Sequence, residues 1–548
     1  MKMETITSFY SILDLRKSPC QENKRPAFFA DLNLDQVIDR IRRDWGENIS
    51  SFYYYLPADQ ECEDYRREVF ADVKNQGVYE VLFAFYKRMK TRREIFFKKE
   101  EVSFCWQRAV WHVQEAGCYC GAFEKLCLGL ENAPLRSAGM RSFLAYLKAY
   151  IASADFQKMQ EAADQLQKQL ESVRLVLTYE NDRIAVSAGE VEGAYDSFLQ
   201  QYFPQAEKSG LYREGMRNPF EAIKELTELE QELCRLCRKL YPDFFQKIEV
   251  FYKRYEEYAP EVLTQFSSEI GYYLSFYRFE QRMRERGFSF AEPTILSNPA
   301  ENPRTERHEA YPEHEEGEAG GWAEGTADNE MRVRGLYDLA LACAACEESR
   351  EIVSNDIEMG SGEGFFVLTG PNQGGKTTFA RSLGQMVYFA KMGLDVPAVS
   401  ARLCRFADIL THFSVEESVE TGRGKLKEEL ERLAPMMESV RGEQTKAFIV
   451  INELFTTAAN YDACIMGKRV LEFFLRQGCR GIYVTHLKEL SGADPKIVSL
   501  RALLDEQGRH TYRIERSSAA DCASAVRLVE KHGLKYDQLK KRLAGGTI

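Results

Sequence analysis

The sequence predicts a mainly α-helical first half followed by an α/β domain, and two patterns carry this prediction. Long aromatic-rich segments with helical periodicity fill residues 30–290, and VYEVLFAFYKRMKTRREIFFKKEE is one of them. From residue 335 onward, short strand-like runs alternate with helical ones, which favours a mostly parallel sheet. At 548 residues the chain is too long for one hydrophobic core, so more than one domain is expected.

The first predicted domain covers residues 1–295. Within it, VRLVLTYENDRIAVS (173–187) has two β-branched runs around a polar turn, which predicts a small hairpin at the tip of a helical arm. Residues 296–333 are acidic, rich in Gly and Pro and poor in aliphatic residues, which is typical of a linker or mobile loop. A solvated spacer is favoured there over an acidic interaction site. The third region, 334–548, is the α/β domain with a C-terminal helical segment.

Composition excludes several classes of protein. Hydrophobic residues make up 44% and charged residues 29%, and no apolar run reaches the roughly 20 residues of a membrane helix. The N-terminal MKMETITSFYSILDLRKS has no sustained apolar core of a signal peptide, so a cytoplasmic protein without membrane association is expected. The net charge of -11 argues against a wholly basic surface, although a local basic patch for nucleic acid remains compatible with it.

The strongest motif is a glycine-rich loop between a strand-like run, FFVLT, and an amphipathic helical segment. It matches GxxxxGK[ST], in which loop N–H groups bind phosphate oxygens, Lys376 reaches the β- and γ-phosphates, and Thr377 ligates Mg²⁺. ATP and Mg²⁺ are therefore the predicted cofactors. The predicted nucleotide-binding residues here are Gly370, Pro371, Asn372, Gln373, Gly374, Gly375, Lys376, Thr377 and Thr378.

Two further strand-like runs end in polar residues that fit a nucleotide site. AFIVINE ends at Asn452, on the metal side, and Glu453, which would orient or deprotonate the attacking water. GIYVTH ends at His486, which would contact the γ-phosphate. The alternative is that the Asn-Glu pair merely ends a strand at the surface. Thr377 and Asn452 are thus the predicted metal residues, and Glu453 and His486 the predicted catalytic residues.

These motifs together resemble one family, the ATPase domain of the MutS proteins of DNA mismatch repair. The resemblance lies in LTGPNQGGKTT, KMGLDVPA, INELFTTAANYDA, VTHLKEL and ADCASAVRLVEKHGL, and it covers about residues 335–535. It implies an ABC-type P-loop ATPase fold and a homodimer. It also implies that Ile352, in IVSNDIEM, lies where the family packs an aromatic against the base, and that Tyr461 and Asp462 belong to a dimer-facing loop.

The helical half resembles the MutS core more loosely. DLNLDQVIDRI, YRREVFADVKN and EIGYYLSFYRFEQRMRERGFSFAEP follow the order of lever helices, and the segment 173–187 lies where a clamp would be. No Phe-x-Glu mismatch-reading motif precedes this scaffold and no nuclease-like extension follows the ATPase region. We therefore expect a protein that does not read mismatches in the strict sense.

Three departures from the family pattern concern activity. The family's metal-side aspartate is Asn452 here, which removes one negative charge from the Mg²⁺ environment and predicts slower turnover. The family's trans-acting serine aligns with Gly424, so the predicted trans segment is Gly422, Arg423 and Gly424, with backbone N–H groups as donors. The glycine-rich run after the catalytic glutamate becomes LFTTAAN.

Two function hypotheses follow. The first is an ATP-hydrolysing dimeric clamp that binds DNA in repair or recombination. The alternative is an ATP-gated structural switch that hydrolyses slowly or not at all and acts through a protein partner, such as another repair protein. The candidate DNA phosphate contacts are the basic run Lys87, Arg88, Lys90, Arg92 and Arg93, and a second group, Lys208, Arg213 and Arg217.

Overall fold

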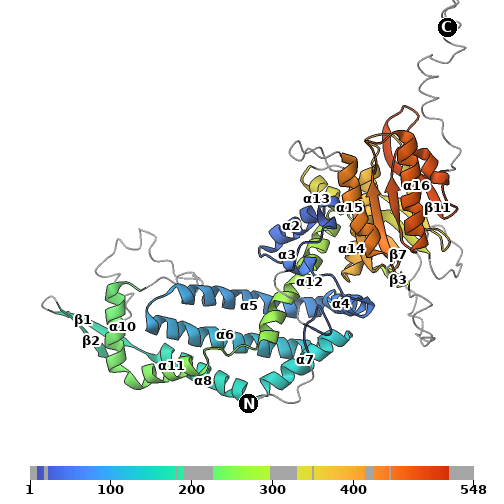
Figure 1. Ribbon diagram of the computed structural model, residues 1–548. Helices are drawn as coiled ribbons and strands as arrows, with labels where there is room; N and C mark the ends of the chain where they lie inside the picture. The colour runs from blue at the N-terminus through green and yellow to red at the C-terminus, as the bar shows by residue number, and fades with distance from the viewer. Residues whose placement is uncertain are drawn as a thin grey trace, which may run out of the picture. The chain divides into compact units, whose positions relative to one another are not determined.

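The computed structural model describes residues 9–17, 23–180, 183–189, 226–296, 330–348, 351–413, 425–442 and 446–517 (Figure 1). The chain divides into two compact units. The helical unit comprises Met1–Pro19 and Glu68–Leu274, and the sheet unit comprises Cys20–Arg67 and Ser275–Ile548. The sheet unit therefore takes in two segments of the predicted first domain, residues 20–67 and 275–295, because their side chains pack within that unit. Most of the predicted linker lies outside the described residues.

The helical unit is built from long helices with strong N-terminal caps. The Ser137 and Ser153 hydroxyls accept the N–H groups of Met140 and Phe156, and Thr227 forms a reciprocal capping box with Glu230. These caps set where the helices that start at Ala138, Ala154 and Glu228 begin. The helices are α5 (Gln76–Glu101), α6 (Cys105–Glu131), α7 (Ala138–Ile151), α8 (Ala154–Ser172), α10 (Glu228–Leu240) and α11 (Pro242–Arg254), and the unit also holds parts of α4 (Gln60–Val73) and α12 (Glu261–Glu285).

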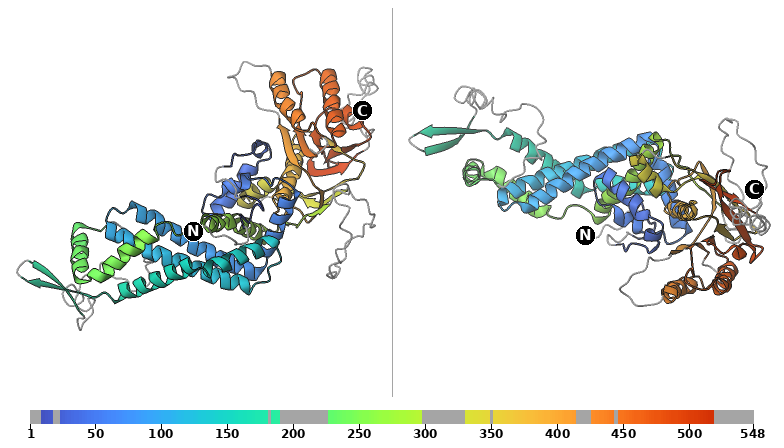
Figure 2. Two further views of the ribbon diagram at one scale, coloured as in Figure 1. Left: turned by 60° about the horizontal axis from the view of Figure 1, so that its bottom comes forward. Right: turned by 90° about the horizontal axis from the view of Figure 1, so that it is seen from above.

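The predicted hairpin is confirmed. β1 (Leu175–Glu180) and β2 (Arg183–Ala188) pair antiparallel, with Leu175 opposite Ala188. It lies at one end of the helical unit, next to α10, in all the views (Figures 1 and 2). After β2 the described residues end at Gly189, and they resume at Leu226, just before α10.

A buried ionic cluster crosses the helical unit between α5 and α6. Glu115 accepts hydrogen bonds from Lys99 at 2.8 Å and from the Tyr258 hydroxyl at 2.9 Å, and it pairs with Arg92 at 2.9 Å. Lys99 also lies 3.2 Å from His112 Nδ1. Each of these charged groups therefore has a partner within the cluster, which offsets the cost of burying it away from water.

The sheet unit contains a six-stranded sheet in the order β12-β11-β6-β10-β9-β8. All neighbouring pairs are parallel except β11 and β12. This confirms the mostly parallel sheet and the strands predicted at 365, 447 and 481. The strands are β6 (Phe365–Thr369), β8 (Asp408–Phe413), β9 (Ala447–Asn452), β10 (Arg480–Val484), β11 (Ile497–Leu504) and β12 (His510–Arg516).

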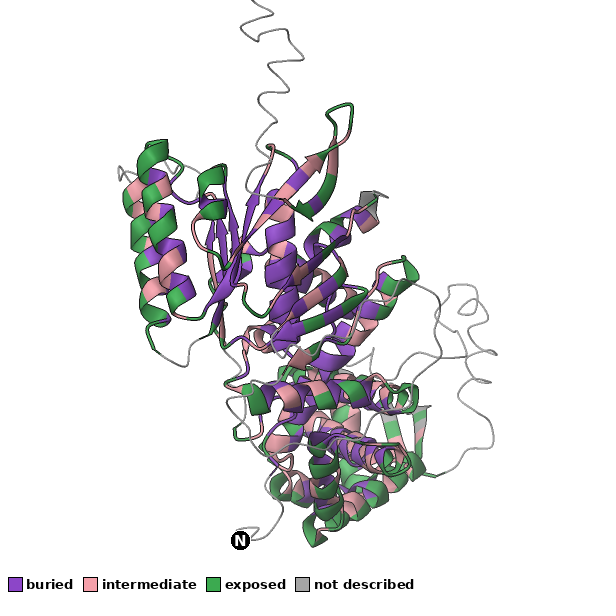
Figure 3. Ribbon diagram, turned by 90° about the vertical axis from the view of Figure 1, so that its right-hand side faces the viewer, coloured by how far each residue is buried: buried purple, intermediate pink, exposed green. Residues whose placement is uncertain are grey.

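Helices cover the two faces of this sheet. β6 and β9 are buried along their whole length, which is why both read as continuous apolar runs. Figure 3 shows these strands buried beneath partly exposed helices. Alternate strand residues, including Phe365, Val367, Ile449 and Ile451, share a hydrophobic core with side chains of α15 (Lys425–Ser439) and α16 (Asn460–Arg476). The strands that α14 (Lys376–Lys391) contacts include β8, β9 and β10.

A second sheet has four strands in the order β3-β7-β4-β5. Its strands are β3 (Thr294–Leu296), β7 (Ser400–Cys404), β4 (Met331–Leu336) and β5 (Asn355–Met359). The remaining elements of the sheet unit are α1 (Phe28–Asp31), α2 (Leu34–Trp45), α3 (Ser50–Tyr54), α13 (Leu339–Glu348) and the 3₁₀ turn η1 (Lys488–Gly492). The predicted C-terminal helical segment lies outside the described residues. Among the described helices, none combines the length and apolar character needed to cross a membrane.

Candidate functional site

The glycine-rich loop runs from the end of β6 into the N-terminus of α14. Gly370 has φ of 139°, and a Cβ at this position would lie 2.9 Å from the Ala502 Cβ. Gly375, the N-cap of α14, has φ of 82°, which a side chain would strain. The sequence therefore needs glycine at both points, and the loop leads directly into a helix N-terminus, where backbone N–H groups and the helix dipole favour an anion.

Lys376 begins α14 and its side chain folds back along the loop. Its ammonium donates to the carbonyl oxygens of Gly370 at 3.1 Å and Pro371 at 2.8 Å. Burial lowers the pKa of this ammonium, and the Glu453 carboxylate opposes that effect. The cation is thus held inside the loop that the sequence predicts to bind phosphates.

The two predicted metal residues meet. The Thr377 hydroxyl donates to the Asn452 amide oxygen at 3.0 Å. Asn452 ends β9 and is 7% exposed, and β9 is separated from β6 by β10. Parallel strands present their carboxyl ends at one edge of a sheet, so residues 75 positions apart come together there.

The two predicted catalytic residues also meet. Nε2 of His486 lies 3.2 Å from Oε1 of Glu453. Glu453 directly follows β9, has φ of 55°, and donates its backbone N–H to the Val484 carbonyl at 2.9 Å. A left-handed conformation at a non-glycine residue is strained and persists only where surrounding contacts hold it. Both side chains are partly exposed, Glu453 at 31% and His486 at 49%, so both are accessible to a ligand.

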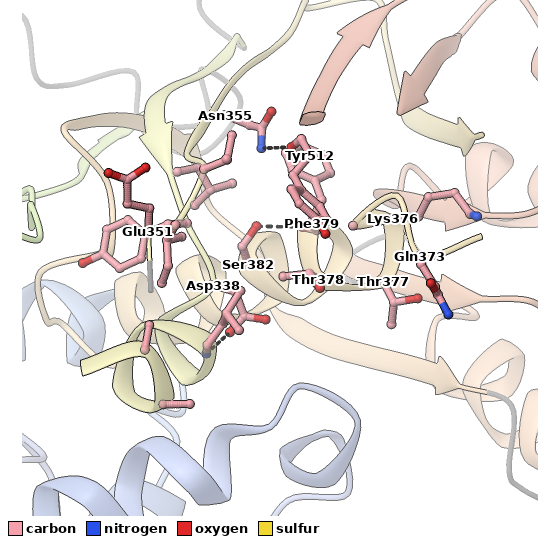
Figure 4. Close-up of a pocket in the computed structure, with 18 of the residues that line it drawn as sticks. Asp338, Glu351, Asn355, Gln373, Lys376, Thr377, Thr378, Phe379, Ser382 and Tyr512 are labelled. Carbon is pink, nitrogen blue, oxygen red and sulfur yellow. Dashed lines mark hydrogen bonds between the residues drawn. The ribbon is translucent and has the colours of Figure 1, made fainter. Parts of the chain in front are cut away.

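A cavity of about 910 Å³ opens over these groups. Figure 4 shows Lys376 and Gln373 on one side, Glu351 on the other, and the Tyr512 ring between them in this view. Of the predicted site residues, the cavity is lined by Ile352, Asn372, Gln373, Gly375, Lys376, Thr377, Thr378, Glu453 and His486. Four more are not part of the lining: Gly370, Pro371 and Gly374 belong to the loop, and Asn452 contacts Thr377.

Tyr512 is a cavity residue that the sequence did not single out. It lies on β12, is 50% exposed and has φ of 57°. Asn355 fixes the strand around it, because its side chain donates to the Tyr512 carbonyl at 3.1 Å and accepts the Ile514 N–H at 2.8 Å. The signal for Tyr512 was weak, since one aromatic in the polar strand HTYRIER has no motif around it.

The remaining predicted site residues divide into two groups. Tyr461 and Asp462 lie in the first turn of α16 and are exposed, with Tyr461 at 76%, and neither lines the cavity. The trans segment, Gly422, Arg423 and Gly424, lies outside the described residues. The same is true of Lys208, Arg213 and Arg217.

The first basic group is only partly available to DNA. The side chain of Arg92 is 11% exposed, pairs with Glu115 and donates to the Tyr258 hydroxyl at 3.2 Å, so it is removed from the candidate contacts. Lys87 is exposed and lies over the Phe83 ring. Of the aromatics beside this group, Phe85 and Tyr86 are buried whereas Phe96 and Phe97 are exposed.

Comparison with known proteins finds a family model that matches part of the α/β region. Residues 366–524 match the family model for MutS domain V. The DNA mismatch repair protein MutS of Thermotoga neapolitana is 26% identical over 204 residues, which are 35% of this chain and 25% of that protein. The corresponding proteins of Chloroflexus aurantiacus and Streptococcus gordonii are 26% and 27% identical over 206 and 203 residues, covering 36% and 35% of this chain.

The chain spans about a quarter of the length of these curated relatives. The match begins within β6 and includes the glycine-rich loop, Asn452, Glu453, His486 and Tyr512. Residues 366–524 therefore match the MutS domain V model, and over about a third of its length this chain is similar to the MutS proteins of DNA mismatch repair.

Proposed function

We propose that this chain is a MutS-like protein that binds and hydrolyses ATP and acts on DNA as a nucleotide-gated dimeric clamp in repair or recombination. The observation that carries the proposal is the convergence of the glycine-rich loop with the Glu453–His486 pair in one cavity of about 910 Å³. This volume lies within the range of small-molecule and cofactor sites, roughly 300–1,000 Å³. The proposed setting is the cytoplasm, in association with DNA.

The proposed orientation of ATP follows from the chemistry of the cavity. The phosphates lie against the loop and Lys376, where the N–H groups and the cation lie. The base lies between Ile352 and the ring of Tyr512, which offer an aliphatic and an aromatic surface. Tyr512 then supplies the aromatic stacking surface, and Ile352, at the position where the family packs an aromatic, supplies an aliphatic one.

Glu453 and His486 are the proposed catalytic pair. The Glu453 carboxylate orients a water molecule toward the γ-phosphate and accepts its proton. His486 Nε2 holds that carboxylate in place at 3.2 Å and is exposed enough to contact the γ-phosphate. The strained backbone of Glu453 aims its side chain out of the sheet edge into the cavity.

The residues present fit Mg²⁺ only in part. Thr377 and Asn452 would hold it, and both supply the hard oxygen donors that Mg²⁺ prefers. When bound, Mg²⁺ neutralises charge that develops on the phosphates. Asn452 supplies an amide in place of a carboxylate, so the site lacks one negative charge and we expect a weaker hold on the metal.

Asn452 also favours the second candidate, an ATP-gated switch that hydrolyses slowly and acts through a protein partner. The two candidates differ in steady-state phosphate release with Mg²⁺. We expect the wild type to exceed Glu453→Gln by at least about tenfold while both proteins bind ATP. A wild-type rate equal to that of Glu453→Gln favours the switch, and absence of ATP binding by both proteins overturns both candidates.

DNA binding requires a separate experiment. Binding to perfect, mismatched and branched duplexes is measured with and without ATP at two salt concentrations. A clamp should bind at least one of these DNAs with an affinity that depends on ATP and decreases with salt. Lys87→Ala combined with Arg88→Ala should reduce the salt slope, with exposed Lys158→Ala on α8 as the control. Equal, ATP-independent binding to all three DNAs contradicts the clamp.

The dimer is proposed from the family relationship. In it, each protomer supplies residues 422–424 to the nucleotide of its partner, and the exposed Tyr461 and Asp462 lie at the interface. Sedimentation with and without a non-hydrolysable ATP analogue tests this, and a protein that remains monomeric with the analogue contradicts it.

A further inference from the structure

We propose that Glu429, on α15, is a positioning residue through which this helix sets the orientation of Glu453. The inference rests on the proposed function, because the proposed function gives Glu453 its catalytic role. Its structural basis is a single buried hydrogen bond: Oε2 of Glu429 accepts the backbone N–H of Phe455 at 3.1 Å.

The backbone that carries Glu453 is strained at two points. Glu453 has φ of 55° and Phe455 has φ of 63°, and both are non-glycine residues in the left-handed region. Such a segment returns to ordinary backbone angles unless its surroundings prevent it. The orientation of the Glu453 side chain therefore depends on whatever holds residues 453–455.

Contacts from three elements hold this segment. The Val484 carbonyl of β10 accepts the Glu453 N–H at 2.9 Å, and the Tyr483 hydroxyl lies 3.5 Å from the Leu454 carbonyl. The side chains of Leu454 and Phe455 are buried in the core beside α15 and α16. Glu429 supplies the acceptor for the N–H at the far end of the segment, in the buried core.

Glu429 is itself held in place. It is 3% exposed, and its backbone carbonyl lies 3.1 Å from Nε2 of His412 on β8. A buried carboxylate that accepts a backbone N–H makes a strong hydrogen bond, and its removal leaves the N–H buried without an acceptor. Through this hydrogen bond and Leu454, the position of α15 is therefore coupled to the orientation of Glu453.

The location of α15 makes this coupling relevant to hydrolysis. The helix begins at Lys425, directly after residues 422–424, which are proposed to face the partner's nucleotide. Glu429 is not among the described residues that line the cavity. It is thus placed to influence the catalytic carboxylate without touching ATP.

The test compares two substitutions of Glu429 with a control on the same helix. Glu429→Gln keeps a side-chain oxygen that accepts the Phe455 N–H, whereas Glu429→Met has similar length and no such acceptor. The control is Glu431→Gln, which changes an exposed carboxylate. For each protein, kcat, KM, ATP affinity and hydrogen exchange of the Phe455 amide are measured.

We expect Glu429→Met to lower kcat at least about tenfold and to speed exchange of the Phe455 amide, with ATP affinity within about twofold of wild type. Glu429→Gln should restore most of kcat and most of the amide protection, and Glu431→Gln should change neither. An unchanged kcat in Glu429→Met overturns the proposal. So does a Glu429→Gln protein as impaired as Glu429→Met, because the hydrogen bond would then not be the cause.

Hydrogen exchange separates the failure of this inference from that of the proposed function. If the wild type does not hydrolyse ATP, the proposed ATPase function fails. Slow exchange of its Phe455 amide would still support the hydrogen bond between Glu429 and Phe455. Fast exchange of that amide in the folded wild type overturns the inference even if hydrolysis is rapid. This measurement also applies if Glu429→Met does not fold.

Discussion

The Thr377 hydroxyl donates a hydrogen bond to the Asn452 amide oxygen at 3.0 Å. This contact joins the first turn of α14 to the end of β9, two strands away from the strand that precedes the loop. The proposed metal site therefore has its two protein oxygens in place. It lacks the carboxylate charge that would make it a strong Mg²⁺ site.

Asn452→Asp should strengthen Mg²⁺ binding. One added negative charge a few ångströms from the metal contributes more than about 1.4 kcal/mol at a partly buried site, so the Mg²⁺ concentration for half-maximal phosphate release should fall at least about tenfold. Titration of Mg²⁺ at saturating ATP measures it. Asn452→Leu removes the acceptor of the Thr377 hydroxyl and should raise the Mg²⁺ concentration for half-maximal phosphate release. If the wild type and Asn452→Asp need the same Mg²⁺ concentration, Asn452 is excluded from the metal site.

Lys376→Ala should abolish ATP binding. The ammonium is the buried cation of the glycine-rich loop, and its loss removes both the charge for the phosphates and two hydrogen bonds within the loop. Calorimetric titration with ATP is the measurement. Lys427→Ala is the matched control, because this lysine is 67% exposed on α15. The Lys427→Ala protein should bind ATP as the wild type does. Unchanged affinity in Lys376→Ala would remove the assignment of the nucleotide site.

His486→Ala should slow hydrolysis and leave ATP binding largely intact. The histidine is the partner of the Glu453 carboxylate at 3.2 Å, so its loss frees that carboxylate to rotate. We expect kcat to fall by about 10- to 100-fold, less than the roughly 100- to 10,000-fold of a lost general acid or base, because the Glu453 carboxylate itself remains. His486→Gln, which retains an N–H donor, should lose less. A kcat unchanged in both variants would argue against a role for the pair.

Tyr512→Ala should weaken ATP binding, whereas Tyr512→Phe should not. Aromatic stacking on a base contributes about 1–3 kcal/mol, which corresponds to a loss of roughly 5- to 150-fold in affinity. Inorganic tripolyphosphate has no base and should bind both variants as it binds the wild type. Phe97→Ala, at an exposed aromatic residue of α5 that does not line the cavity, is the control. Equal loss of ATP and tripolyphosphate affinity would place Tyr512 against the phosphates instead of the base.

The buried His112 should make the helical unit less stable in mild acid. Burial lowers the pKa of its imidazole, and the nearby Lys99 ammonium adds to this effect, while Glu115 opposes it. In the unfolded chain the pKa is about 6.5, so below this pH the unfolded state binds the extra proton and the free energy of unfolding decreases. The stabilisation is present above about pH 6.5 and is lost as the pH falls below that value.

Hydrogen exchange of α5 and α6 amides between pH 7 and 5 measures this loss. After correction for intrinsic exchange, protection should decrease by up to about 1.4 kcal/mol per pH unit from this one group. His112→Gln should flatten the dependence, because glutamine does not titrate. A wild-type curve parallel to that of His112→Gln would contradict the prediction.

Local patterns were sufficient for the parts of the fold that depend on neighbouring residues. The glycine-rich loop, the runs at 365, 447 and 481, and the hairpin at 173–187 each have a periodicity or a motif within about ten residues, and all appear as strands, turns or helix starts where predicted. The convergence of Thr377, Asn452, Glu453 and His486 also followed, since carboxyl ends of parallel strands share one edge.

The sequence by itself therefore determined the α/β domain, its central strands and the phosphate-side part of the cavity lining. Only the tertiary structure decided that Arg92 is held by Glu115 and Tyr258, that residues 23–67 pack within the sheet unit, that Tyr512 lines the cavity, and that Glu429 accepts the Phe455 N–H. Each of these depends on a pairing between segments distant in the sequence. Burial and packing select such pairs, and periodicity along one segment carries no information about which distant side chain will be its partner.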